Sequence, residues 1–362
     1  IVLWSIATAC TFFSSGFWSF LFFRTLVGIG EAAYATITPA LLSDFYPPNA
    51  RNRALTIFYT AIPVGAAIGF GLGGVLGQAL GWRYAFLLCG IPGIIISLLI
   101  LFIQDPGLGR FENFESRENV PWVQTLSFLA HNQAYRYCSA GAILITFAIG
   151  GLADWIPTYL VRVDKVSVAS AGLVAGAVTV IGGIVGTMAG GYLADYADKM
   201  TKNPYFAVSA LALAPAVLFS IPVLAVHNVA VAAICLLVCQ CCVWVYNGPM
   251  NAVIANNVPA NMRARAFSVN VLLIHLLGDA ISPVIIGKIS DATGSLVLAV
   301  LLCPITMALA GVVWGLGWHF IENSRGYHSR HELPILQESF DINHLDADEL
   351  EDINELRGYD DT

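Results

Sequence analysis

Charged side chains are scarce in this chain of 362 residues. Asp, Glu, Lys and Arg make up 11% of it, whereas a soluble domain carries about a quarter. A water-facing surface over most of the chain is therefore excluded. Half of the 24 acidic residues lie after Phe320, so the net charge of −7 belongs mainly to the C-terminal tail. Basic blocks of the kind that binds nucleic acid are missing, and we expect no nucleic-acid partner.

Signatures of catalysis and of cofactor binding are missing as well. The sequence has no phosphate-binding loop, nucleotide motif or catalytic triad. None of its eight cysteines has metal-ligand spacing with a histidine. We interpret Cys239, Cys241 and Cys242 as packing residues, with palmitoylation as the alternative. We therefore expect no enzyme activity, no metal and no cofactor.

What the sequence has in abundance is long apolar runs. Residues 54–80 and 166–192 contain no charge, and each run is longer than the 20 or so residues that cross a bilayer core. This pattern predicts an all-α polytopic membrane protein. The predicted spans are residues 1–15, 17–44, 54–80, 84–103, 136–161, 169–193, 204–226, 228–251, 264–289 and 294–321.

A polar stretch at residues 104–135 divides these spans into two blocks. We predict a bundle over 1–103, a linker over 104–135, a second bundle over 136–321 and an acidic tail over 322–362. Lys and Arg favour one set of alternate loops over the other by twelve to four. Because cytoplasmic loops carry the excess of these residues, the linker, the tail and both termini of the full-length protein are expected in the cytoplasm.

One short polar phrase occurs twice in the sequence. Pro47–Ala54 reads PPNARNRA, and Pro259–Ala266, 212 residues later, reads PANMRARA. Three glycines beyond each copy recur at an offset of 213. We interpret the two blocks as parallel copies of one unit, as in transporter halves. Counted back by this offset, two further helices would lie before residue 1, so we expect a parent of twelve spans, of which ten are present here.

These features resemble the major facilitator superfamily, and within it the spinster family. The segments that carry the resemblance are RTLVGIGEA (Arg24–Ala32), FYTAIPVGAAIGFGLGG (Phe58–Gly74), GYLADYADK (Gly191–Lys199), NGPMNAVIANNVP (Asn247–Pro259) and HLLGDAISPVIIG (His275–Gly287). One departure is Tyr196, which stands where the superfamily's loop motif usually has Arg. The resemblance implies a monomeric secondary active transporter, of the proton-coupled symporter type, that moves a lysophospholipid or sphingolipid-like amphipath by alternating access. It also implies the lysosomal, late endosomal or plasma membrane.

Polar groups inside the spans are the candidates for a substrate or proton pathway, because they are costly to place in lipid. They are Arg24, Glu31, Asp154, Asn247, Asn251, His275 and Asp279. Arg24 and Glu31 are seven residues apart on one helix face, with Glu31 as a proton carrier or half of a structural ion pair. His275 and Asp279 form either a proton relay or gate, or a packing pair. Asp154 lies at a solvated cavity rim or binds substrate, and the asparagines line a cavity or hydrogen-bond between helices.

The second set of candidates belongs to the loops, and we expect it to latch the cytoplasmic side. It comprises Arg51, Arg53, Asp195, Arg263 and Arg265. The substrate head group is expected near Arg24, Glu31 and Asn247. Two rival functions remain open at this point: a facilitator for an organic anion or drug, and a truncated membrane protein that does not transport.

Overall fold

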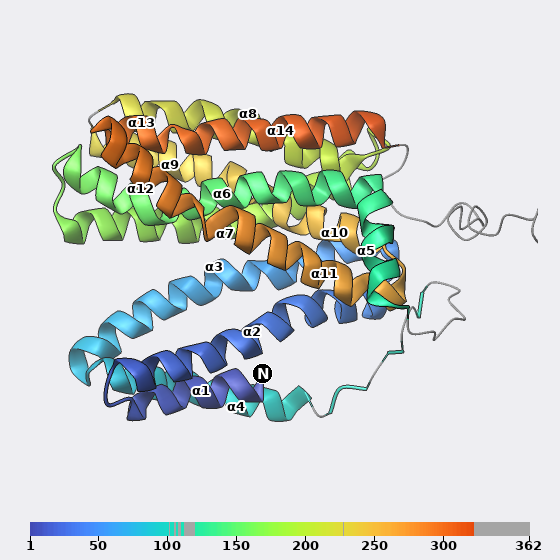
Figure 1. Cartoon of the computed structure of the whole chain (residues 1–362), viewed down its shortest axis with the longest axis horizontal. Coiled ribbons are helices and arrows are strands. Elements are labelled where there is room, and N and C mark those ends of the chain that lie inside the picture. Colours follow the sequence, from blue (N-terminus) through green and yellow to red (C-terminus); the bar gives the residue numbers. More distant parts are fainter. Residues whose placement is uncertain (101, 105, 108–109, 112–119, 227, 322–362) are drawn as a thin grey trace, which may run out of the picture. The chain divides into compact units, whose positions relative to one another are not determined.

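Helices account for the long apolar runs (Figure 1). In the computed structural model, the described residues are 1–100, 102–104, 106–107, 110–111, 120–226 and 228–321, without the side chains of 70–75, 77–78 and 168–169. Within them, eight helical segments are long and apolar enough to cross a bilayer. The predicted all-α membrane fold is confirmed. The acidic tail, residues 322–362, lies outside the described residues.

The helices fall into two groups along the chain. The N-terminal half holds α1 (Val2–Cys10), the short η1 (Thr11–Phe13), α2 (Phe17–Phe45), α3 (Pro48–Ala79) and α4 (Trp82–Ile100). The C-terminal half holds α6 (Gln133–Arg162), α7 (Val168–Ala197), α8 (Pro204–Ala225), α9 (Val229–Val243), η2 (Trp244–Tyr246), α10 (Asn247–Asn257), α11 (Ala260–Ile274), η3 (His275–Asp279), α12 (Ser282–Thr293), α13 (Leu296–Val300) and α14 (Leu302–Phe320).

The structure departs from the expected segment boundaries at two places. Residues 104–135, expected to be a linker, contain the helix α5 (Trp122–His131), which crosses the ends of the longer helices in Figure 1. The span expected to end at Asn251 continues to Asn257. Asn256 is buried there, and its Oδ1 accepts a hydrogen bond from Arg51, so this polar side chain is accommodated within the helix.

The two arginine loops have the same helix boundaries at the same offset. α2 ends at Phe45 and α3 begins at Pro48, and 212 residues later α10 ends at Asn257 and α11 begins at Ala260. Proline at the first helical position suits α3, because its missing N–H has no partner to lose there. We call the end of the helices where these two loops lie the paired-loop end.

Glycines bring α7 close to helices on two sides. An added Cβ at Gly186 or Gly190 would overlap a backbone carbonyl in the α9–η2 segment. One at Gly183 would lie 2.7 Å from Pro63 Cβ of α3, and one at Gly191 would overlap Thr56 of the same helix. By contrast, nothing lies within 4 Å of a Cβ at Gly176, nearer the opposite end of α7. Close packing of α7 on α3 is therefore concentrated toward the paired-loop end.

Candidate functional site

The two halves are joined at the paired-loop end by a reciprocal pair of contacts. Arg263 Nη1 of α11 lies 3.1 Å from Asp44 Oδ1 of α2, with both side chains buried. Arg51 Nη1 of α3 donates to Asn256 Oδ1 of α10 at 3.2 Å. Asp44 and Asn256 are themselves 212 residues apart. The leading arginine of each phrase, Arg51 or Arg263, therefore contacts the residue equivalent to its counterpart's partner.

Both leading arginines are buried, so their polar contacts lie away from solvent. Arg51 and Arg263 are each 1% exposed. Arg51 Nε also donates to Ser43 O at 3.0 Å and its Nη1 to Ala255 O at 3.4 Å, so its guanidinium joins the end of α2 to the end of α10. A buried guanidinium is tolerated only with such partners, and removing one of them leaves a charge without compensation.

A second contact joins α3 to α7 beside the first. Asn52 is fully buried, and its Nδ2 donates to Gly191 O at 2.9 Å and to Asp195 Oδ1 at 2.8 Å. Arg53 Nη2 lies 3.5 Å from the other oxygen of Asp195, but this arginine is 75% exposed. Asp195 therefore accepts a part-buried hydrogen bond from Asn52 and forms an exposed ion pair with Arg53. The hydrogen bond contributes more to holding the helices together.

Deeper in the same seam, α3 meets α10. Tyr59 Oη donates to Asn251 Oδ1 at 2.9 Å, and Asn251 Nδ2 donates to Asn247 O at 2.7 Å. Asn247 is buried and its Nδ2 donates to Thr187 Oγ1 at 3.4 Å. These two asparagines thus hydrogen-bond between helices, as one interpretation of the sequence expects.

Arg265 differs from the other loop arginines because it contacts α5 instead of the N-terminal half. Its guanidinium donates to Val120 O and to Thr125 Oγ1, the latter at 3.2 Å, and lies 5.2 Å from the Trp122 ring centroid. Asn132, between α5 and α6, donates to Asn257 O at 2.9 Å. Arg265 and Asn132 therefore tie α5 to the α10–α11 loop.

The charged candidates on α2 lie away from these contacts. Arg24 and Glu31 are both exposed, and within the described part of the chain neither has an ion-pair partner. Arg24 Cζ lies 5.8 Å from the Phe86 ring centroid of α4, a cation–π distance. Asp154 of α6 is likewise exposed. The structure does not bring these three residues together with the paired-loop contacts.

His275 and Asp279 face each other on a π-helical turn. His275 Nδ1 lies 2.9 and 3.1 Å from the two carboxylate oxygens of Asp279, and η3 interrupts the otherwise α-helical α11–α12 span. The side chain of His275 is 60% exposed. Such turns occur frequently at functional sites. Gly278 on this turn packs on Thr146 of α6, where an added Cβ would lie 3.1 Å from the threonine Cβ.

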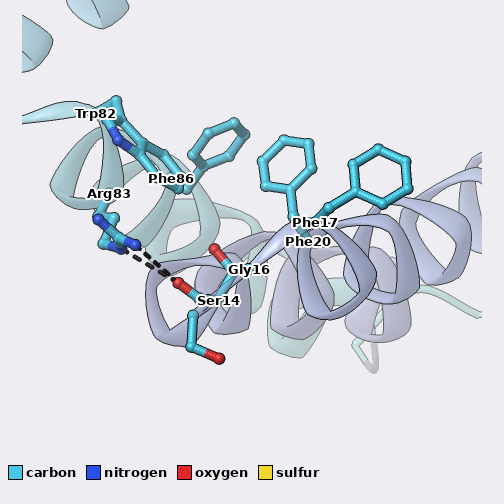
Figure 2. A pocket seen from close by; sticks show the side chains of 8 residues that line it. Ser14, Gly16, Phe17, Phe20, Trp82, Arg83 and Phe86 are labelled. Atoms are coloured by element: carbon cyan, nitrogen blue, oxygen red, sulfur yellow. Dashed lines mark hydrogen bonds between the residues drawn. The ribbon is translucent and has the colours of Figure 1, made fainter.

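A pocket of about 460 Å³ lies within the N-terminal half, near the start of α2 and α4 (Figure 2). Phe17, Phe20 and Phe86 contribute rings to its wall, and Arg83 donates to Ser14 O at 3.0 Å. Aromatic side chains at the end of a span are typical of the membrane–water interface. None of the sequence-predicted pathway residues lines this pocket.

Several residues of the interface were missed by the sequence analysis. They are Asp44, Asn52, Tyr59 and Asn256. Asp44 and Asn256 could have been found, because they occupy equivalent positions of the repeat, seven residues before each leading arginine. Asn52 has no such signal, since its counterpart is Ala264. Within the described residues, no group of three or more His, Cys, Asp or Glu side chains is placed to hold a metal ion.

Comparison with known proteins defines the class of this fold. The sequence model of the Major Facilitator Superfamily matches residues 1–283. A crystal structure of a superfamily transporter, FucP, in the outward conformation superposes with a TM-score of 0.70 at 16% identity, covering 87% of this chain and 80% of that one. A bacterial homologue of the human lysosomal transporter Spinster, inward-facing and occupied, gives 0.52 at 22% identity over 90% and 81%. The fold is that of a major facilitator transporter.

Relatives at higher identity narrow the assignment. Protein spinster of Drosophila melanogaster is 32% identical over 80% of this chain, which spans 50% of that protein's length. The sphingosine-1-phosphate transporter SPNS2 of Danio rerio is 30% identical over 86% of this chain and 68% of its own length. The chain belongs to the spinster family of the major facilitator superfamily. The family expected from the sequence is thereby confirmed.

Proposed function

We propose that this chain forms a secondary active transporter, or the larger part of one, that moves a lysophospholipid or a sphingolipid-like amphipath across a membrane by alternating access. Two bundles, residues 1–103 and 136–321, would move against each other as a monomer. The observation that carries the proposal is the reciprocal pairing of Arg263 with Asp44 and of Arg51 with Asn256, which joins the halves at the paired-loop end.

The paired-loop end then acts as a gate. In the state described here, buried contacts close this gate. Toward the opposite end of the two helices, α7 packs less closely on α3. Rocking would break these contacts and open the paired-loop end, which we assign to the cytoplasm of a lysosomal, late endosomal or plasma membrane. A gate of discrete polar pairs suits two-state movement, because each pair is either made or broken.

The amphipath is supported by the chemistry of α2 and by the relatives. Arg24 is exposed and suits a phosphate, which a guanidinium can bind through two hydrogen bonds. Two of the relatives at about 30% identity are named as transporters of sphingosine 1-phosphate. Glu31, two helical turns from Arg24, is the proposed proton carrier, and His275 with Asp279 the proposed relay.

Uptake by the full-length protein in proteoliposomes tests this function. Labelled sphingosine 1-phosphate and lysophosphatidylcholine would be compared with an organic anion of similar charge, with and without an imposed pH gradient. We expect uptake of an amphipath, accelerated by the gradient, and loss of that acceleration in Glu31→Gln with partial recovery in Glu31→Asp. Preference for the organic anion would contradict the substrate class, and uptake indifferent to the gradient would contradict the proton coupling.

A further inference from the structure

A groove of about 400 Å³ runs along the seam between α3 and α7, and the side chains of Ile57 and Met188 in it are exposed. Ile57, Ala61 and Val64 of α3 form one wall and Met188 of α7 belongs to the other. This volume lies in the lower part of the range of small-molecule sites, roughly 300–1,000 Å³. Because the groove lies along helices that cross the membrane, we expect it to face lipid.

The groove has a charged end and an apolar body. Arg53 and Asp195 close it at the paired-loop end. From Arg53, the residues Ile57, Ala61 and Val64 follow at intervals of four, four and three, so they line one face of α3. Eleven residues of helix from Arg53 to Val64 extend roughly 16 Å, about half of the 30 Å hydrocarbon core. This length matches one leaflet, which would place Arg53 and Asp195 at the head-group level.

The Arg53 guanidinium has N–H donors that could bind a further ligand. It is 75% exposed and its contact with Asp195, at 3.5 Å, engages Nη2 alone. A guanidinium carries five N–H donors in a planar fork that fits a phosphate. By contrast, Arg265, its counterpart in the repeat, uses its guanidinium on α5. The repeat thus has two arginines at equivalent positions, of which one is held by the protein and the other faces the groove.

We propose that this groove is a binding site for a glycerophospholipid of the leaflet at the paired-loop end. Its phosphate binds Arg53, and one acyl chain lies along Ile57, Ala61, Val64 and Met188. This lipid is a resident ligand and not the transported amphipath, so the inference does not depend on the proposed function. Since the walls come from both halves, the lipid binds only while α3 and α7 are packed and so favours the closed paired-loop end.

Lipid titration of the purified full chain in a neutral detergent tests the site. The midpoint of heat unfolding would be followed against dioleoyl phosphatidylglycerol, against dioleoylglycerol, which has the same chains without phosphate, and against glycerol 3-phosphate, which has the phosphate without chains. A ligand that binds the folded state raises the midpoint with its concentration. We expect a rise with phosphatidylglycerol alone, and an equal rise with dioleoylglycerol or glycerol 3-phosphate would overturn the proposal.

Two matched pairs of variants locate the effect. Ala61→Trp fills the groove, whereas Ile62→Trp places the same side chain on an exposed neighbour outside it. Arg53→Gln removes the phosphate ligand, whereas Arg265→Gln removes the equivalent arginine of the repeat. We expect at least tenfold weaker binding of phosphatidylglycerol for Ala61→Trp and Arg53→Gln, and unchanged binding for the two controls. If a variant and its control lose phosphatidylglycerol binding equally, the assignment of the site to this groove is contradicted.

Native mass spectrometry supplies an independent measurement if Ala61→Trp folds poorly. We expect one phosphatidylglycerol retained on the unaltered protein and on Arg265→Gln, and none on Arg53→Gln. Phosphatidylglycerol retained on Arg53→Gln would overturn the assignment of Arg53 as the phosphate ligand. Displacement of the lipid by sphingosine 1-phosphate would show that the groove belongs to the transport path, and would overturn the resident lipid while leaving the proposed transport intact.

Discussion

Asp44 and Arg263 form a buried ion pair between α2 and α11, with 3.1 Å between Oδ1 and Nη1. The equivalent pair of the repeat, Asn256 and Arg51, is a hydrogen bond of 3.2 Å with one charge instead of two. The two halves of the latch are thus alike in geometry and unlike in charge. Separating the charged pair exposes both a carboxylate and a guanidinium that have lost their partner. The contact between Asp44 and Arg263 should therefore set most of the free energy needed to open the paired-loop end.

Asp44→Asn tests that assignment. The substitution removes the carboxylate charge that contacts the buried Arg263 guanidinium, and we expect the free energy of unfolding to fall by about 3 kcal/mol. The double variant Asp44→Asn/Arg263→Gln removes both charges and should lose less than the sum of the two single variants. Chemical or thermal unfolding of all four proteins in one detergent measures this coupling. Additive losses would mean that the two side chains do not interact.

Asn256→Asp makes the opposite change. An aspartate at this position would place a carboxylate beside the Arg51 guanidinium and make the two reciprocal contacts alike. We expect a more stable closed paired-loop end, seen as a higher unfolding midpoint together with slower amphipath uptake in proteoliposomes. Asn256→Ala, which deletes the acceptor, should lower the midpoint instead. If both variants shift the midpoint in the same direction, the contact does not act as a latch.

Gly191→Ala tests the close approach of α7 to α3. The added methyl would overlap Thr56, and we expect it to push the two helices apart and to lower stability. Thr56→Ala in the same protein removes the two nearest atoms, Oγ1 and Cγ2, but keeps Cβ at 2.8 Å, and should restore part of the loss. Gly176→Ala is the matched control, because open space surrounds that position, and should be neutral or slightly stabilising. If Thr56→Ala does not restore stability to Gly191→Ala, the loss does not come from overlap with Thr56.

Asp279→Asn distinguishes a proton relay from a packing pair. The amide keeps an acceptor within reach of His275 Nδ1 but cannot take up a proton near neutral pH. If the pair relays protons, uptake driven by a pH gradient should be lost while exchange of substrate without a gradient continues. Asp291→Asn, an exposed acid at the end of α12, should retain both activities. Loss of both in Asp279→Asn, with a lower unfolding midpoint, would support packing.

Much of the architecture could be predicted from the sequence, because membrane spans are encoded locally. Charge-free runs of more than 20 residues form helices in lipid, since every backbone group must be satisfied within the segment. The repeated phrase around Arg51 and Arg263 predicted two equivalent loops, and the helix boundaries repeat at that offset. The family resemblance was carried by local motifs in the same way. Helix α5 escaped prediction because it lies within a polar stretch.

The sequence alone therefore determined the membrane class, the family and the two equivalent arginine loops, all of which depend on composition and short-range pattern. Only the tertiary structure decided that Arg51 and Arg263 are buried while Arg53 is exposed, and that Arg265 contacts α5. The choice of Asp44 as a partner across 219 residues likewise came from the packing of α2 on α11. The physical reason is that burial and pairing are properties of contacts between distant helices, which no local pattern records.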